Sequence, residues 1–173
     1  MSATFKGDFK KLEAWANLTE GAPKVLPVIS KNLAEESISL IRDGMNRGID
    51  PYGRKYKKLV LRRGQPLKRT GGMFAAWNRQ RASAKGFKVS NAKEYSAYHQ
   101  EGTGIYGPRG EPITPTRAKA LAIPMPGGGT MFRRSVKGTP KRMMVPNGRL
   151  PKRWKKAYRE TVNEVFSSHF RSR

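Results

Sequence analysis

The chain has 173 residues, of which 36% are apolar, together with 18 glycines, 12 prolines and no cysteine. This length suits one domain with a small core, and the lack of cysteine excludes disulfide frameworks, thiolate nucleophiles and cysteine-based zinc sites. The sequence has no run of about 18 apolar residues, so we expect no transmembrane helix and no membrane partner. The net charge of +24 falls entirely in residues 51–173, which hold 29 Lys and Arg against five acids, and it predicts an anionic partner.

The N-terminal part of the chain favours helices. Residues 8–18 suit a short helix, and Glu20-Gly21-Ala22-Pro23 is expected to break it, so residues 1–22 form an arm or short helix before a single domain over residues 23–173. A long helix is predicted over about residues 24–47, where apolar residues recur at helical spacing. The residues of this face are Leu26, Ile29, Leu33, Leu40 and Ile41, and Leu33 and Leu40 are expected to pack near Trp154 and Phe166 of the last helix.

The middle of the chain predicts irregular structure and a first hairpin. Residues 54–69 show no clear period and are expected to form an extended basic arm. Thr70-Gly71-Gly72 can cap a short helix over residues 73–77. Residues 78–90 suit a β-hairpin that turns near Lys85-Gly86.

The C-terminal half predicts more β-structure and a closing helix. A short helix or corner over residues 92–101 leads into a Gly- and Pro-rich loop. The apolar runs 118–125 and 131–136 flank Pro126-Gly127-Gly128-Gly129 and predict a pair of antiparallel strands. An extended segment over 140–146 precedes a helix over 150–170. The fold class is therefore α+β: a long N-terminal helix, a small antiparallel β-sheet with extended loops, and a C-terminal helix packing on the sheet.

The sequence offers little that an enzyme could use. Its two histidines are His99 and His169, and no second pair of ligands accompanies His99-Gln100-Glu101. It contains neither a nucleophile-elbow serine nor a phosphate-binding glycine motif. We therefore expect no catalytic residue, no metal and no cofactor, and we interpret His99 as structural.

Two basic segments are the candidate binding residues. One holds eight cations in the sixteen residues of the predicted arm, and the other lies in the first turns of the closing helix, where the helix dipole disfavours positive charge. Such side chains contact phosphates without reading base sequence, but the basic tract alone leaves DNA and an acidic protein surface equally open as partners. The candidate contacts are Arg54, Lys55, Lys57, Lys58, Arg62, Arg63, Lys68 and Arg69 in the arm, and Lys152, Arg153, Lys155 and Lys156 in the helix.

Five short motifs follow one another along the chain. They span residues 48–59 (with Asp50-Pro51-Tyr52-Gly53), 64–73 (with Thr70-Gly71), 98–103 (Tyr98-His99-Gln100-Glu101-Gly102-Thr103), 104–108 and 138–145 (with Pro140-Lys141-Arg142). In this order they resemble the motifs of the virion-morphogenesis and tail-completion proteins of tailed bacteriophages. Glu101 and Met143-Met144 depart from the family pattern, which has an aromatic residue and Pro-Phe there. The resemblance marks Pro51, Gly53, Thr70, Gly71, Tyr98, His99, Gly102, Pro140 and Arg142 as residues of family motifs and of assembly.

The resemblance implies a small α+β structural protein of the virion, in the neck or upper tail, made and assembled in the host cytoplasm. Members form homo-oligomeric rings, often hexamers, that complete the tail or join it to the DNA-filled head. The implied partners are connector and neck proteins, the tail terminator or tail tube, and genomic double-stranded DNA in the channel. A free, sequence-independent nucleic-acid-binding protein is the alternative, and it explains the charge but not the five ordered motifs.

Overall fold

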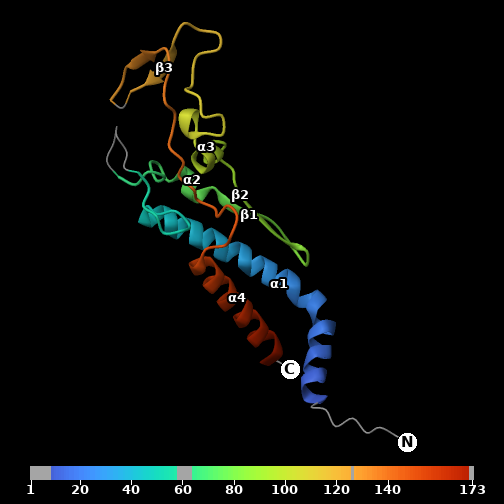
Figure 1. The fold of residues 1–173 in the computed structure, drawn as a ribbon. Coiled ribbons are helices and arrows are strands. Elements are labelled where there is room, and N and C mark those ends of the chain that lie inside the picture. The colour runs from blue at the N-terminus through green and yellow to red at the C-terminus, as the bar shows by residue number, and fades with distance from the viewer. Residues whose placement is uncertain (1–8, 58–63, 126, 172–173) are drawn as a thin grey trace, which may run out of the picture.

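The computed structural model describes residues 9–57, 64–125 and 127–171 (Figure 1). It is α+β, as predicted: a long N-terminal helix, two small antiparallel sheets and a C-terminal helix. The elements in chain order are α1 (Phe9–Arg47), α2 (Gly72–Ala75), β1 (Trp77–Ser83), β2 (Gly86–Asn91), α3 (Tyr95–Glu101), a 3-10 turn (Gly104–Tyr106), β3 (Leu121–Pro124), β4 (Thr130–Arg133) and α4 (Lys152–Arg171).

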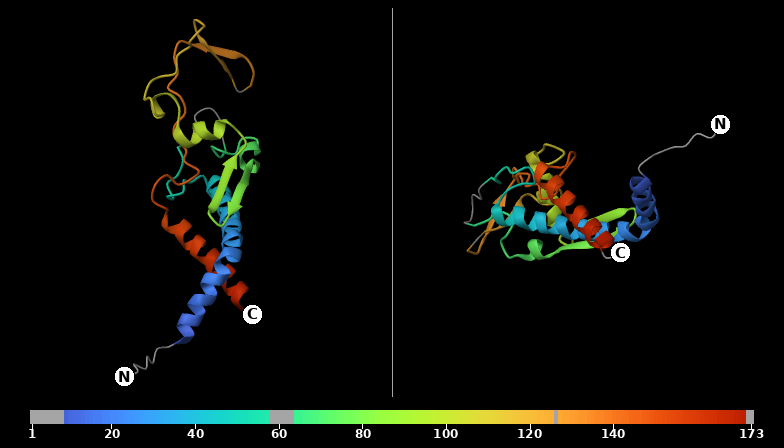
Figure 2. Two further views of the ribbon diagram at one scale, coloured as in Figure 1. Left: turned by 90° about the vertical axis from the view of Figure 1, so that its right-hand side faces the viewer. Right: turned by 90° about the horizontal axis from the view of Figure 1, so that it is seen from below.

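Helix α1 is the element on which α4, β1 and β2 pack. The predicted break at residues 20–23 is wrong, because α1 continues through it. The helix instead changes direction in its N-terminal part (Figure 2). The sequence there contains Gly21, Pro23 and Pro27, and a proline removes a helical hydrogen bond and bends a helix without having to end it.

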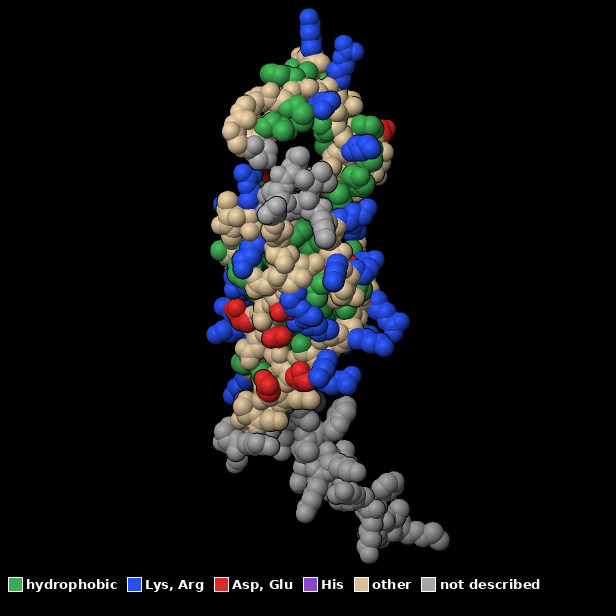
Figure 3. Space-filling view, turned by 90° about the vertical axis from the view of Figure 1, so that its left-hand side faces the viewer, with side chains coloured by type: hydrophobic (Ala, Val, Ile, Leu, Met, Phe, Trp, Pro, Cys, Tyr) green, Lys and Arg blue, Asp and Glu red, His purple; other side chains and the backbone are tan. Residues whose placement is uncertain are grey.

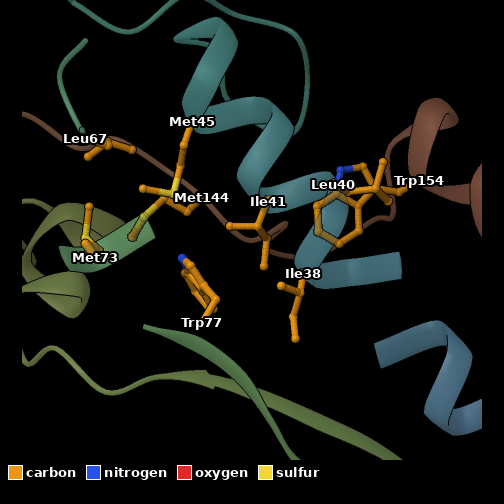
Figure 4. Packing of buried hydrophobic residues seen from close by; sticks show 9 residues of the cluster. All are labelled: Ile38, Leu40, Ile41, Met45, Leu67, Met73, Trp77, Met144 and Trp154. Carbon is orange, nitrogen blue, oxygen red and sulfur yellow. The ribbon is translucent and has the colours of Figure 1, made fainter. Parts of the chain in front are cut away.

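The main core lies between the C-terminal half of α1 and the segments that cover it (Figure 4). It consists of Ile38, Leu40, Ile41, Met45, Leu67, Met73, Trp77, Met144 and Trp154. A smaller cluster of Val25, Ile29 and Val165, with Leu33, Val162 and Phe166 packed against it, joins α1 to α4. Leu40 thus shares a cluster with Trp154, and the partly buried Leu33 shares one with Phe166, so both leucines pack near the last helix as predicted. Leu26 is 40% exposed, so its predicted core position is wrong, and the buried face runs through Val25.

Each of the two sheets is a two-stranded hairpin. Strands β1 and β2 pair in antiparallel register with an irregularity between Arg79 and Arg81, and they turn at the predicted place. Helix α4 packs along α1 and meets this hairpin through the rings of Tyr158 and Phe87, whose centroids are 6.3 Å apart. Strands β3 and β4, four residues each, form the second hairpin, which is shorter than the predicted apolar runs.

The second hairpin lies at one end of an elongated molecule (Figures 1 and 2). We call residues 104–138, apart from Pro126, the tip lobe. The C-terminus of α4 and the N-terminus of α1 lie at the opposite end. Within the described ranges, no helix combines the length and the apolar character needed to cross a membrane.

Candidate functional site

The first motif folds into a turn around the carboxylate of Asp50. Its Oδ1 accepts hydrogen bonds from the backbone N–H groups of Tyr52 and Arg54, both at 2.9 Å. Its Oδ2 accepts one from Nε of Arg54 at 2.6 Å, and the carboxylate is buried. An Asp that binds the backbone two residues ahead of it is the physical basis of an Asx turn, so the local sequence dictates this structure.

Two tyrosines connect this turn to the segment that precedes α4 through hydrogen bonds. The hydroxyl of Tyr56 donates to the carbonyl of Met143 at 2.7 Å, and burial raises the pKa of Tyr56 well above its ordinary value. The hydroxyl of Tyr52 donates to the carbonyl of Asn147 at 2.7 Å. The first motif and the last are therefore joined across about 90 residues of chain.

The third motif binds the last one through the side chain of Gln100, in α3. Its Oε1 accepts hydrogen bonds from the N–H groups of Met144 at 2.8 Å and Val145 at 3.1 Å. Its Nε2 donates to the carbonyl of Val145 at 2.8 Å. The N–H of Arg142 donates to the carbonyl of His99 at 2.7 Å. One amide side chain thus provides hydrogen-bond partners for the backbone of the extended segment, as a neighbouring strand would.

The two chain segments that lead into and out of the tip lobe are bonded to each other. The Thr103 N–H donates to the Thr139 carbonyl at 3.0 Å, and the Thr139 N–H donates to Oγ1 of Thr103 at 2.8 Å. Gly138, at φ 86°, lies so close to the backbone of Thr103 that a Cβ at Gly138 would overlap the Thr103 carbonyl. Only glycine combines this positive φ with this approach. We call the contacts among residues 48–56, 98–105 and 137–147 the motif junction.

His99 is a half-buried residue of the motif junction. Burial, and after it the guanidinium of Arg142, lowers the pKa of the imidazole, so the neutral form is favoured. Its Nδ1 has no hydrogen-bond partner among the described residues, and its ring meets the edge of Tyr95 at 6.4 Å. Across the described part of the chain, no three His, Asp or Glu side chains are grouped so that they could hold a metal.

The structure brings most of the predicted family-motif residues together. Pro51 and Gly53 lie in the Asp50 turn, and Arg142 is buried in the junction. The remaining junction residues are His99 and Gly102, which are inside it, Pro140, which is half-buried, and Tyr98, which is 59% exposed. Thr70 and Gly71 lie elsewhere, at the start of α2, where the N-cap residue is Gly71 at φ 75°, which has no side chain to make a capping hydrogen bond.

The cations of the predicted arm have unequal surroundings. Arg54 is held by Asp50, and Lys68 donates to Oδ1 of Asn46 at 2.8 Å. Lys57 lies 6.0 Å from the centre of the Tyr106 ring. Lys55 and Arg69 are exposed, and the predicted contacts Lys58, Arg62 and Arg63 lie outside the described residues.

The four predicted cations of α4 are all exposed. Arg153 binds Asp43 of α1 at 2.7 Å, and Nζ of Lys156 lies 3.8 Å from Glu160. Within the described residues, Lys152 and Lys155 have no ion-pair partner. Because the Asp50 turn contacts the loop before α4, both basic segments border the same end of α1.

The carboxylates are spread along the sequence, but the structure brings Glu36 of α1 near Glu160 and Glu164 of α4. Burial raises the pKa of Glu36, Arg153 opposes this, and the charges of Glu164 and Glu160 raise it further. We call Glu36, Glu160 and Glu164 the acidic stripe. Figure 3 shows acidic side chains gathered on the lower part of one face. The i, i+4 spacing of Glu160 and Glu164 is the signal that could have identified it.

The arrangement suits binding between surfaces. Asp50, the one buried carboxylate among the described residues, is engaged by hydrogen bonds within its own turn. The motif junction fixes the direction of the tip lobe, while exposed cations such as Lys152 and Lys155 face solvent. Comparison of this chain with protein-family models, with curated proteins and with solved structures finds no match.

Proposed function

We propose that this chain is a structural protein of the neck or upper tail of a tailed-phage virion. In this role it forms a ring, often sixfold in the family that it resembles, completes the tail and joins it to the DNA-filled head. The observation that carries the proposal is the motif junction. Segments that resemble family motifs in the first, middle and last thirds of the chain bind one another there through backbone and side-chain hydrogen bonds.

The charge supports an assembled state with an anionic neighbour. A net charge of +24 on one subunit is multiplied around a ring, and self-repulsion opposes closure unless anions compensate it. Double-stranded DNA in a channel supplies one negative charge per ~1.7 Å of axis. An acidic face of an adjoining ring could supply carboxylates instead, and the exposed cations near α2 and α4 suit either partner.

The test is deletion of the gene from the phage that encodes it, followed by complementation with the intact chain. We expect filled heads and separate tails by electron microscopy without the chain, and joined, infectious particles with it. Joined and infectious particles in the absence of the chain would refute the proposal.

Charge reversal then separates the two anionic partners. The variant replaces Lys68, Arg69, Lys152 and Lys155 with Glu, and its matched control reverses Lys85 and Lys88 of the first hairpin, which are also exposed. If the partner is an acidic ring, the variant fails to join even empty heads to tails. If the partner is DNA, empty particles join and only filled ones leak or fail.

The free nucleic-acid-binding protein remains the second candidate. The exposed cations Lys152 and Lys155, which have no ion-pair partner in the described part of the chain, favour it. A protein of that kind binds duplex DNA as an isolated monomer, with an affinity that falls steeply with salt. Binding titrations at several salt concentrations, with the mass of the complex measured at each, decide between the two. A tight monomer–duplex complex, together with normal particles after gene deletion, would establish the second candidate.

A further inference from the structure

The tip lobe combines apolar and basic side chains on its surface. Phe132 of β4 is 67% exposed, and Ile105, Tyr106 and Ile113 are each 38–39% exposed. The lobe also carries six cations against one acid, Glu111; they are Arg109, Arg117, Lys119, Arg133, Arg134 and Lys137. A surface of this composition is typical of a protein-binding site, because large exposed apolar side chains gain free energy only when a partner covers them.

The second hairpin also lacks support from its own chain. It has two strands of four residues, and among the described residues it has no third strand and no close packing against another helix or strand. Two-stranded hairpins are marginally stable in water until one of their faces is covered. The lobe is held in place by the motif junction, but its outer face, with Phe132 opposite Ala122, is open.

A surface of complementary character lies at the opposite end of the molecule. The acidic stripe on α1 and α4 adjoins a notch of about 230 Å³ lined by Val25, Val28, Val165, Ser168 and His169. Leu26 and Val28 of α1 are 40% and 47% exposed beside it. The notch is large enough to receive an aromatic side chain, and the stripe offers carboxylates to neighbouring cations.

These two surfaces cannot meet within one molecule of this shape. They lie at opposite ends of it in Figures 1 and 2, and α1 alone is about 58 Å long at 1.5 Å per residue. A contact between them therefore requires two copies. Contact between two different surfaces of identical chains is head-to-tail, and repetition of such a contact closes into a ring when its rotation allows.

We propose that the tip lobe of one copy docks on the acidic stripe and notch between α1 and α4 of the next copy. Phe132 enters the notch, and Arg133 and Arg134 lie against Glu160 and Glu164. The inference rests on the proposed function, which calls for a ring, and it names the surfaces that build this ring. A second copy fits better than DNA, because the phosphate backbone offers nothing to cover Phe132, Ile105 and Ile113.

The absence of cysteine from the chain allows a direct test by disulfide cross-linking. Phe132→Cys and Val28→Cys are made as separate full-length variants, one of them carrying a mass tag, and are mixed and oxidised. We expect the mixed disulfide dimer to dominate over both homodimers. The matched control pairs Phe132→Cys with Lys88→Cys, an exposed position on β2, and should give only background.

Charge exchange tests the same contact without cysteine. Arg133→Glu with Arg134→Glu should weaken self-association at least tenfold by sedimentation, because like charges then face each other. Glu160→Arg with Glu164→Arg in a second population should restore association when the two are mixed. Phe132→Ser keeps all charges and should also weaken association at least tenfold, because an anchor that fills a pocket is removed.

Three results would overturn the inference. They are equal cross-linking to Val28→Cys and Lys88→Cys, a chain that stays monomeric at millimolar concentration and low salt, and lobe variants that weaken binding to duplex DNA while self-association is unchanged. None of these results bears on the deletion experiment. A ring with cross-links elsewhere refutes this interface and leaves the proposed function standing, whereas normal particles without the chain refute the proposed function.

Discussion

Replacing Gln100 with alanine tests the motif junction most directly. The side chain makes three hydrogen bonds to the backbone of Met144 and Val145, at 2.8, 3.1 and 2.8 Å. A hydrogen bond of this kind contributes about 0.5–1.5 kcal/mol net, so Gln100→Ala should cost roughly 3 kcal/mol. For a chain of this size that corresponds to a fall in Tm of roughly 6–12 °C.

The assay is thermal and urea unfolding followed by circular dichroism, together with amide hydrogen exchange. Exchange at Met144 and Val145 should accelerate in the variant, because their N–H groups lose their acceptor. Gln100→Glu keeps both accepting interactions but loses the donor, so its loss of stability should be intermediate. Glu101→Ala, at the exposed neighbouring position, is the matched control and should change stability by about 0.5 kcal/mol or less.

Two results would refute this reasoning. One is an unchanged Tm together with unchanged exchange at Met144 and Val145 in Gln100→Ala. The other is an equal loss of stability in Glu101→Ala, which would show that the helix itself, rather than the amide side chain, determines the effect.

Four further changes should act as follows. Ile41→Ala, at a 1% exposed core position, should lower the free energy of unfolding by about 2–5 kcal/mol in urea titrations, and Leu33→Ala, which is half-buried, should lower it by less. Gly138→Ala should destabilise the motif junction, because its Cβ would overlap the Thr103 carbonyl, and exchange at Thr139 should report this. Tyr56→Phe should cost about 1 kcal/mol in thermal unfolding through loss of its hydrogen bond to Met143. Because the His99 pKa is lowered in the folded chain, stability should fall as the pH drops from 6.5 through the lowered pKa, and His99→Gln should remove this part of the pH dependence in melts at several pH values.

The periodic elements could be predicted from the sequence. Apolar residues at helical spacing located α4 and most of α1, and the glycines at the turns located both hairpins. The predictions that proved wrong concern positions where local sequence preferences compete with tertiary packing. Glycine and prolines predicted a break near residue 22, yet α1 bends and continues, and the buried face ran through Val25 rather than Leu26.

The motif junction could not be predicted from the sequence, because its contacts join residues that are far apart along the chain. Gln100 and the segment at Met144 are 44 residues apart, and an amide that replaces a strand partner leaves no periodic signal. The turn at Asp50 is different, because its hydrogen bonds are local and an Asp followed closely by Gly favours such a turn. The acidic stripe joins Glu36 of α1 to Glu160 and Glu164 of α4, so it depends on the packing of two helices that are far apart in the sequence.

The attachment of the tip lobe has a mechanical consequence. Two chain segments, bonded to each other at Thr103 and Thr139, run side by side from the body of the molecule into the lobe. A pull on the lobe is therefore shared by two backbones, and it reaches the hydrogen bonds of Gln100 to Met144 and Val145, which join the same two segments. The lobe should therefore transmit force and rotation to the body of the molecule, whereas two segments that were not bonded to each other would let the lobe move independently.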